Sequence, residues 1–317
     1  MIDKIWNRKM LNSLLFILKW IVLFATYLFL AYKLFTFEQY EMLWFHFRQI
    51  TISHYFWLMI VFLLLPINIA LEAIKWQKIV EKSEHISFYI ALKAVFAGFA
   101  TGFVTPNRIG EMVGRMIFVS PENRKIAAIY SLLNSFTQNY VIAIVGLPAA
   151  AYYFLIKKND TYDFNNSILV IAVAFILLFT ILYFLLPNIV LLFNKYNKIN
   201  SLKSISNYKI IDLLIITLYS LMRFMVFSVQ FFVILQFFGV ELSVFEAFIS
   251  IPTSYLFVTF TPSLAFSEAA IRSSYAVIFI GTFSENIAGI AIAGFVLWLI
   301  NFVLPMLIGS KLVAKTK

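Results

Sequence analysis

The stretch from Ser167 to Asn194 reads SILVIAVAFILLFTILYFLLPNIVLLFN and contains no charged side chain. A helix needs about 20 apolar residues to cross a hydrocarbon core about 30 Å thick. The stretch therefore predicts a transmembrane helix. The composition of the 317 residues agrees, because 62% are hydrophobic and only 13% are charged, which excludes an ordinary soluble domain.

Further runs poor in charge lie on both sides of this stretch. Five are long enough to span a membrane, namely 12–36, 54–73, 126–156, 210–238 and 286–310, and three are short, namely 88–105, 246–262 and 269–281. The run 12–36 lacks a small-residue cleavage site, so we expect a retained first span. The sequence predicts one all-α membrane domain over 1–317, with six transmembrane helices and two re-entrant hairpins at 88–119 and 246–281. Eight full spans are the alternative.

The basic residues predict the orientation of the chain. In the six-span arrangement, eighteen Lys and Arg residues fall on one side, in the N-terminus and in 74–93, 106–125, 195–209 and 311–317. Three fall on the other side, Arg48, Lys157 and Lys158. Because loops rich in Lys and Arg stay in the cytoplasm, we expect a multi-pass protein of the cytoplasmic membrane with both termini inside. The aromatic-rich segment 37–57 is expected to lie at the outer interface.

A motif occurs twice, 156 or 157 residues apart, which is half the chain. The copies are Thr105-Pro106 with Glu111 and Arg115, and Thr261-Pro262 with Glu268 and Arg272. Each copy follows a short apolar run, and the predicted topology makes the two face opposite sides. The pattern thus predicts an inverted repeat with halves at about 54–156 and 210–310, an architecture common in secondary transporters. Chance is the alternative, since Thr-Pro and Glu-x-x-x-Arg are each frequent.

The motif has the chemistry of an anion site. Proline ends one half-helix and suits the start of the next, whose free N–H groups attract a phosphate. Each Glu lies one turn before its Arg, in the favourable order. A charge at the membrane centre costs about 3 kcal/mol, so it normally faces a cavity or a partner. Each pair could instead be a self-neutralised structural pin, but Arg108 adds a charge beside the first pair that Glu111 cannot cancel.

Two further features lie within predicted spans. Arg223 stands at the middle of 210–238 and is too far from Asp212, about 16 Å along the helix, to pair with it. We expect it to meet Glu268, a helix-end carbonyl or the substrate, with a substrate or gate role favoured. The polar residues of 126–156 include Asn134 and Gln138, one turn apart, and predict hydrogen bonds between helices, with cavity lining as the second interpretation.

The sequence GFVTPNRIGEMVGR from Gly102 to Arg115 resembles the flippase-like family of the lysylphosphatidylglycerol synthase transmembrane region. The resemblance covers most of the chain. It implies functional roles for Pro106, Arg108, Gly110, Glu111 and Arg115 and, through a late Pro and Glu motif, for Pro262 and Glu268. Together with Arg223 and Arg272, these are the candidate substrate-binding residues.

The chain departs from the family pattern at two places. The segment 263–267, Ser-Leu-Ala-Phe-Ser, lacks the usual glycines before the second Glu, and no charged pair stands near Asn134 and Ser135. The chain also ends a few residues after its last predicted span, whereas the family member that aminoacylates lipid continues into a soluble catalytic domain. The resemblance therefore implies translocation of an anionic phospholipid or lipid-linked precursor between leaflets, without synthase activity.

Two other classes of function stay open. The chain could be an integral-membrane transferase acting on a lipid phosphate, or a non-transporting scaffold subunit of an envelope enzyme. A transferase should place an acid or base and an acceptor pocket on one face, whereas a flippase should present equivalent half-sites to both leaflets. We expect no cofactor, no metal and no nucleic acid, and a lipid phosphate headgroup as ligand. An envelope-biosynthesis enzyme or a second copy of the chain could be a partner.

Overall fold

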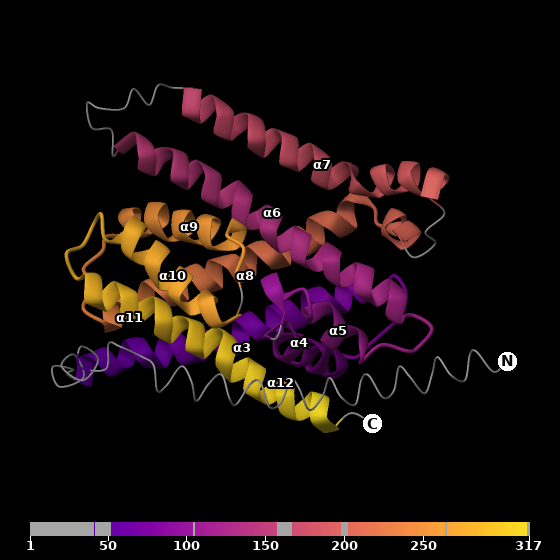
Figure 1. Cartoon of the computed structure of the whole chain (residues 1–317), viewed down its shortest axis with the longest axis horizontal. Coiled ribbons are helices and arrows are strands. Elements are labelled where there is room, and N and C mark those ends of the chain that lie inside the picture. The colour runs from indigo at the N-terminus through magenta and orange to yellow at the C-terminus, as the bar shows by residue number, and fades with distance from the viewer. Residues whose placement is uncertain are drawn as a thin grey trace.

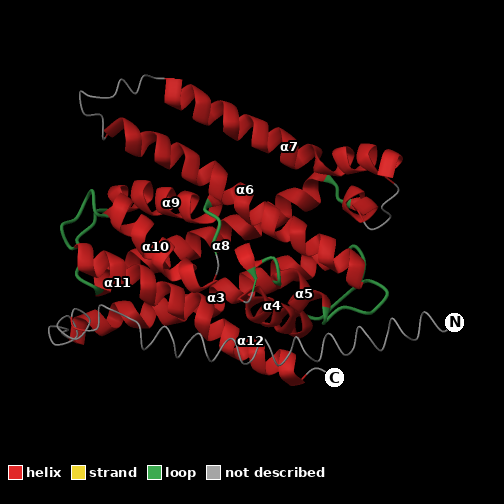
Figure 2. Cartoon of the chain, viewed as in Figure 1, coloured by secondary structure: helices red, strands yellow, loops and turns green. Residues whose placement is uncertain are grey.

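The computed structural model describes residue 41 and residues 52–103, 105–156, 167–197, 202–263 and 265–315. Every secondary-structure element in these ranges is a helix (Figure 1, Figure 2). The α-helices are α3 (Ile52–Val80), α4 (Phe88–Phe103), α5 (Glu111–Met116), α6 (Arg124–Ile156), α7 (Ser167–Asn197), α8 (Ile210–Phe237), α9 (Val244–Phe260), α10 (Ala265–Ile280), α11 (Ile287–Trp298) and α12 (Leu304–Lys315). The short elements are η1 (Pro106–Arg108), η2 (Leu202–Asn207) and the π-helical η3 (Leu299–Val303).

Within the described ranges, five helical stretches are long and apolar enough to cross a membrane: His54–Val80, Arg124–Ile156, Val170–Leu192, Ile210–Phe237 and Ile287–Lys315. They match five of the six predicted spans. The sixth, 12–36, lies outside the described residues, as does most of the interfacial segment 37–57. Helices α4 and α9, with 16 and 17 residues, are the shorter apolar elements that the sequence also marked. The prediction of an all-α membrane fold is confirmed.

Helices α3 and α8 form the central antiparallel pair. Near one end of α3, the carbonyl of Val61 accepts a hydrogen bond from Gln230 at 2.8 Å. Just beyond the other end, Lys82 forms an ion pair with Asp212 at 2.8 Å. As residue numbers rise along α3, the numbers of the α8 residues that it contacts therefore fall. The two helices run in opposite directions, so their C-terminal ends lie at opposite ends of the molecule.

Each half of the chain contains a helical hairpin. In the first, α5 folds back along α4, and the hydroxyl of Thr101 accepts a hydrogen bond from the backbone N–H of Gly114 at 3.1 Å. In the second, α10 folds back along α9, with the rings of Phe257 and Phe279 4.8 Å apart. Proline in each turn cannot donate a helical hydrogen bond, so α4 and α9 end where the sequence predicts. Helix α4 packs along α12, and α9 packs along α6.

The tips of the two hairpins touch each other. The backbone N–H of Asn107 donates to the carbonyl of Ser263 at 2.9 Å, and the N–H of Ser263 donates to Oδ1 of Asn107 at 2.8 Å. Asn107 and Arg108 both have left-handed backbone angles, with φ of 48° and 60°. Asn tolerates this region better than most residues, and the turn directs Arg108 back over α4.

Two of the basic residues counted above on the basic side are buried inside helices. They are Lys75, which lies inside α3, and Arg115, which lies inside α5. Helix α3 continues past the predicted boundary at residue 73 because Trp76, Ile79 and Val80 are buried in the core. One end of the molecule stays rich in exposed basic residues, since the loops after α3 and before α8 meet there through Lys82 and Asp212.

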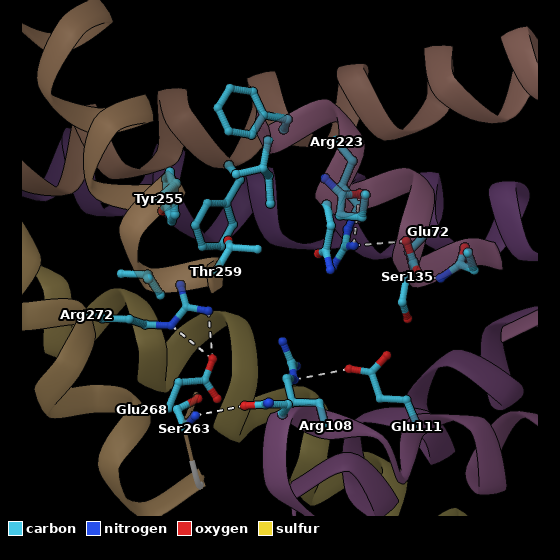
Figure 3. A pocket seen from close by; sticks show the side chains of 18 of the residues that line it. Glu72, Arg108, Glu111, Ser135, Arg223, Tyr255, Thr259, Ser263, Glu268 and Arg272 are labelled. Carbon is cyan, nitrogen blue, oxygen red and sulfur yellow. Dashed lines mark hydrogen bonds and ion pairs between the residues drawn. The ribbon is translucent and has the colours of Figure 1, made fainter. Parts of the chain in front are cut away.

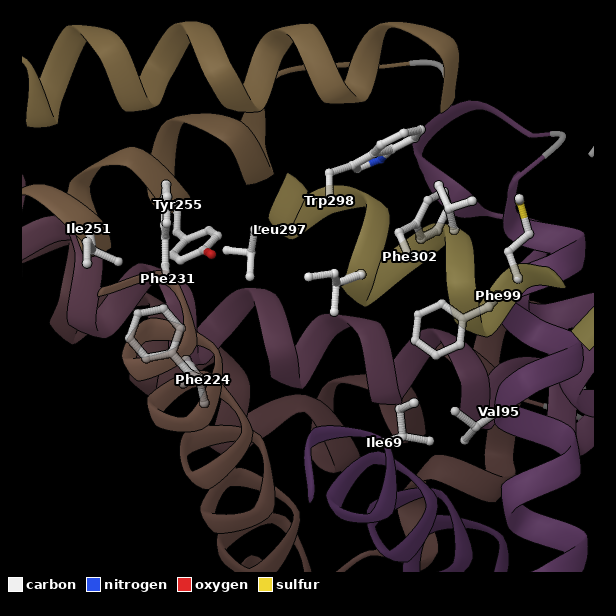
Figure 4. Close-up of a cluster of buried hydrophobic side chains, with 14 of the residues drawn as sticks. Ile69, Val95, Phe99, Phe224, Phe231, Ile251, Tyr255, Leu297, Trp298 and Phe302 are labelled. Carbon is white, nitrogen blue, oxygen red and sulfur yellow. The ribbon is translucent and has the colours of Figure 1, made fainter. Parts of the chain in front are cut away.

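The apolar core lies between the hairpins and the central helices. Phe224 and Phe231 from α8, Tyr255 from α9 and Trp298 from α11 contribute to it (Figure 4). In a membrane, such rings stabilise helix association through close packing instead of through release of water. This packing fixes α9 and α10 against α8 beside the polar residues described next.

Candidate functional site

A polar cavity of about 340 Å³ lies where the hairpin tips approach the central helices (Figure 3). This volume falls within the range of small-ligand sites, about 300–1,000 Å³. Most of its lining is polar or charged: Asn68, Glu72, Asn107, Arg108, Glu111, Asn134, Ser135, Gln138, Asn139, Ile142, Arg223, Phe224, Phe227, Tyr255, Val258, Thr259, Thr261, Ser263, Glu268 and Arg272. Residues from both halves of the chain therefore build one site.

Glu72 of α3 is the centre of a buried ion cluster. Its Oε1 accepts from Arg115 at 2.7 Å and from Asn134 at 2.8 Å. Its Oε2 lies 2.9 Å from Nζ of Lys75 and 3.0 Å from Nη1 of Arg223. Only 1% of Glu72 is exposed. One carboxylate thus holds three cations that come from three different helices.

Glu72 and Lys75 were missed by the sequence reasoning. The apolar run 54–73 predicts a span that ends at residue 73, which would leave both charges at a membrane surface. A signal was present, because Glu72 and Lys75 stand three residues apart and the apolar residues Trp76, Ile79 and Val80 follow them. A pair at this spacing on a helix neutralises itself, so the helix can continue in an apolar environment.

Arg223 of α8 meets Glu72 and not Glu268, the acidic partner the sequence reasoning had considered. Its Nε also donates to Oδ1 of Asn68 at 2.9 Å, and its Nη1 lies 3.4 Å from Oε1 of Gln138. Arg223 still lines the cavity, as a substrate or gate role requires. The hydrogen bonds that Asn134 and Gln138 make to other helices confirm the interpretation of the polar residues in α6.

In the first hairpin, Glu111 joins two arginines. It lies 3.1 Å from Nε of Arg108 and 3.0 Å from Nη2 of Arg115. The Arg108 guanidinium also stands 4.1 Å from the ring centre of Phe302, a distance at which a cation–π attraction operates. Arg108 and Glu111 line the cavity, whereas Arg115 is 3% exposed and lies behind Glu72, outside the lining.

In the second hairpin, Glu268 and Arg272 form a pair of their own. Nη2 of Arg272 lies 2.7 Å from Oε1 of Glu268. Glu268 is 5% exposed, the Arg272 side chain is 20% exposed, and both line the cavity. Figure 3 shows Arg272 and Arg108 on one side of the cavity and Arg223 across from them. The three arginines come from α10, the first hairpin tip and α8.

The remaining predicted residues shape the hairpins. Pro106 begins η1, and Pro262 stands exposed at the second tip. Gly110 packs so closely on α4 that a Cβ there would lie 2.3 Å from the carbonyl oxygen of Thr101. Gly110 and Pro262 are not part of the cavity lining. These residues shape the hairpin turns and thereby position the charged residues that follow, Glu111 in the first hairpin and Glu268 in the second.

Positive charge exceeds negative charge around the cavity. Among the described residues in it and directly behind it, five are basic and three are acidic: Lys75, Arg108, Arg115, Arg223 and Arg272 against Glu72, Glu111 and Glu268. Two lining residues, Asn68 and Tyr255, also have buried donors without a hydrogen-bond partner, namely Nδ2 of Asn68 and the hydroxyl of Tyr255. A buried donor left unpaired costs about 1–3 kcal/mol, so an anionic acceptor would be stabilised there. Within the described ranges, no group of three His, Cys, Asp or Glu could hold a metal ion.

The fold and the site define a multi-pass, all-helical membrane protein with a charged cavity at the tips of two helical hairpins. The chain belongs to the family described as the lysylphosphatidylglycerol synthase TM region, whose model matches residues 14–309. The family resemblance is thereby confirmed. Neither a curated protein nor a solved structure matches the chain.

Proposed function

We propose that this protein moves an anionic phospholipid or lipid-linked precursor between the leaflets of the cytoplasmic membrane, holding its phosphate in the polar cavity. The observation that carries the proposal is the excess of two positive charges around a cavity that three arginines line. Guanidinium groups bind phosphate through paired donors, and Arg108, Arg223 and Arg272 approach from separate elements. Family membership supports a role in lipid handling.

The packing of the helices supports an inverted repeat. Asn107 and Ser263 contact each other and are 156 residues apart, the spacing of the repeated motif. Equivalent residues of two repeats can touch only near the symmetry axis that relates them. The pairing of α4 with α12 mirrors that of α9 with α6, and α3 and α8 are antiparallel. The axis then lies in the membrane plane, and the two hairpins enter from opposite faces and meet at the midplane.

The charge distribution supports an orientation with the basic end in the cytoplasm. Lys78, Lys82, Lys125 and Lys209 stand near that end, beside the loops that follow α3 and precede α6 and α8. At the opposite end, the described loops 239–243 and 281–286 contain Glu241 and Glu285 and no Lys or Arg. Under the rule that basic loops remain inside, this arrangement supports a cytoplasmic C-terminus.

Translocation fits the cavity better than group transfer does. Each of the three carboxylates that line it lies within 3.1 Å of a basic nitrogen, so each serves as a counter-ion. A general base requires a carboxylate or imidazole free to take a proton from the acceptor. We therefore propose a transporter and not an enzyme, with no cofactor, and with the lipid phosphate as its ligand.

The test is transport of fluorescent phosphatidylglycerol in vesicles that contain the purified protein. Wild-type protein should make the inner-leaflet lipid accessible to an impermeant quencher, and Arg272→Gln should slow this at least tenfold. Lys125→Gln, which removes an exposed positive charge outside the cavity, is the matched control and should keep the wild-type rate. Equal rates for Arg272→Gln and wild type, or no wild-type transport of any anionic lipid, would refute the proposal.

A further inference from the structure

A second, apolar cavity adjoins the polar one. It has a volume of about 370 Å³ and lies between α6, α7 and α9. We call it the side groove; its lining is Ala143, Leu147, Phe175, Phe179, Leu256, Phe257, Phe260 and Thr261. Thr261 lines both spaces. Along α6, Ile142 faces the polar cavity while the next residue, Ala143, faces the side groove, so the two spaces meet along the same helices.

We propose that the side groove binds one hydrocarbon chain of the lipid whose phosphate occupies the polar cavity. This inference rests on the proposed function and names the part of the substrate that the polar cavity cannot hold. It commits the substrate to a molecule with a long apolar chain, and excludes a free phosphate or a soluble sugar phosphate as the natural ligand.

The chemistry of the lining supports a hydrocarbon occupant. Seven of the eight lining residues are apolar, and the hydroxyl of Thr261, the exception, already donates to the carbonyl of Phe257 at 2.7 Å. The same hydroxyl lies 2.9 Å from the hydroxyl of Tyr275. A polar ligand in the groove would therefore leave its own donors and acceptors unpaired, which costs free energy, whereas a methylene chain has none to lose.

The position of the groove explains how a chain could reach it. Helix α7 forms its outer wall, and Phe175 and Phe260 of the lining are 50% and 52% exposed. Within a bilayer, such side chains face lipid, so the groove is continuous with the surrounding hydrocarbon. Its inner end is at Thr261, which also lines the polar cavity. A lipid could thus keep its chain in an apolar environment while its headgroup enters the protein between α6 and α9.

The first experiment fills the groove. Leu147→Trp adds bulk to the groove wall, and Leu177→Trp makes the same change on α7 at a residue that is 57% exposed and outside the lining. Binding is measured with two probes, dioleoyl phosphatidylglycerol and its deacylated, water-soluble headgroup. Leu147→Trp should weaken lipid binding at least tenfold and leave headgroup binding at the wild-type level, and Leu177→Trp should change neither.

The second experiment uses the unaltered protein, so it does not depend on the folding of a variant. A phosphatidylglycerol with a photoactivatable diazirine midway along one acyl chain should cross-link to 143–147, 175–179 and 256–260, and excess unlabelled lipid should suppress this labelling. Labelling spread over the exposed face of α7 without suppression would overturn the groove. Unchanged lipid binding in Leu147→Trp, with binding lost in Arg272→Gln, would also overturn it while leaving the proposed function standing. If wild type binds neither probe, both proposals fail.

Discussion

The two hairpins carry the same Glu-x-x-x-Arg motif in different environments. Arg115 of the first hairpin contacts the carboxylates of Glu111 and Glu72, and it is buried behind the cavity. Arg272 of the second contacts Glu268 and lines the cavity. The central helices account for the difference, because Val229 stands in α8 where the proposed repeat would place the equivalent of Glu72. One copy of the motif therefore serves as an anchor, and the other is available to a ligand.

The hairpins also differ in how they are packed. The first contains Gly98, Gly102, Gly110 and Gly114, and a Cβ at Gly114 would lie 2.3 Å from the carbonyl oxygen of Ala97. The second, residues 244–280, contains no glycine and joins its helices through aromatic rings. Close backbone packing favours a more rigid first hairpin, so the second is the better candidate for movement during the proposed transport.

The largest effect should follow from removing the carboxylate of Glu72, which holds Arg115 of the first hairpin in place. Glu72→Ala leaves Lys75, Arg115 and Arg223 buried without their shared counter-ion. Breaking a buried ion pair in this way costs about 3–5 kcal/mol, so thermal unfolding in detergent should occur at a much lower temperature. Glu268→Ala, which strands one cation that is 20% exposed, should cost less. Equal losses in the two variants would contradict the distinction between the hairpins.

The glycine contact should give the next largest effect. Gly114→Ala forces a methyl group against the backbone of α4, and overpacking of this kind costs about 3 kcal/mol because a carbonyl cannot rotate away as a side chain can. The equivalent position in the second hairpin is Ile271, where a branched side chain is already accommodated. Ile271→Ala should cost about 1 kcal/mol, since this residue is only partly buried. Thermal unfolding of both variants measures the difference.

Conservative replacement of the two arginines sharpens the comparison in transport. Arg272→Lys should fold normally and transport phosphatidylglycerol about tenfold more slowly, because an ammonium cannot reproduce the paired donors of a guanidinium. Both short contacts of Arg115 use Nη2 alone, so a single ammonium could replace them, and Arg115→Lys should transport at close to the wild-type rate. Sequence reasoning alone would expect both variants to lose transport. If Arg115→Lys lost as much transport as Arg272→Lys, the two arginines would have equivalent roles and the distinction between the hairpins would be wrong.

The sequence was sufficient for features that depend on local chemistry. Apolar length predicted the five described spans, and Thr-Pro predicted the ends of α4 and α9. It did not identify the partner of Arg223, because Glu72 lies 151 residues away and their contact depends on how α3 packs on α8. Nor could it separate Arg115 from Arg272, since identical local motifs differ only in which third helix covers them. The side groove likewise depends on tertiary packing, because α9 must lie beside α6 and α7 to complete it.

The smallest effect concerns the bases of the hairpins. Glu84, in the loop before the first hairpin, accepts hydrogen bonds from the backbone N–H of Ser120 at 3.0 Å and from Nδ2 of Asn123 at 3.2 Å. At the second hairpin, the neutral side chain of Asn286 donates to the carbonyl of Phe238 at 3.0 Å. The first base is thus held by a charge, and the second is not.

This contrast predicts a difference in pH dependence. Partial burial alone would raise the pKa of Glu84, but the hydrogen bonds from Ser120 and Asn123 outweigh it and hold the pKa below its ordinary value of 4.5. A carboxyl group whose pKa is lowered by folding stabilises the folded state above that ordinary value, and its contribution is lost as the pH falls through the lowered pKa. Glu84→Gln should therefore lower the free energy of unfolding by about 1 kcal/mol at pH 7 and by less below pH 4.5.

The control is Asn286→Ala, whose cost should be similar at both pH values, because the amide does not titrate. Unfolding temperatures of the two variants and wild type at pH 7 and pH 4 test this, and a Glu84→Gln deficit that stays constant would show that the charge does not hold the first hairpin.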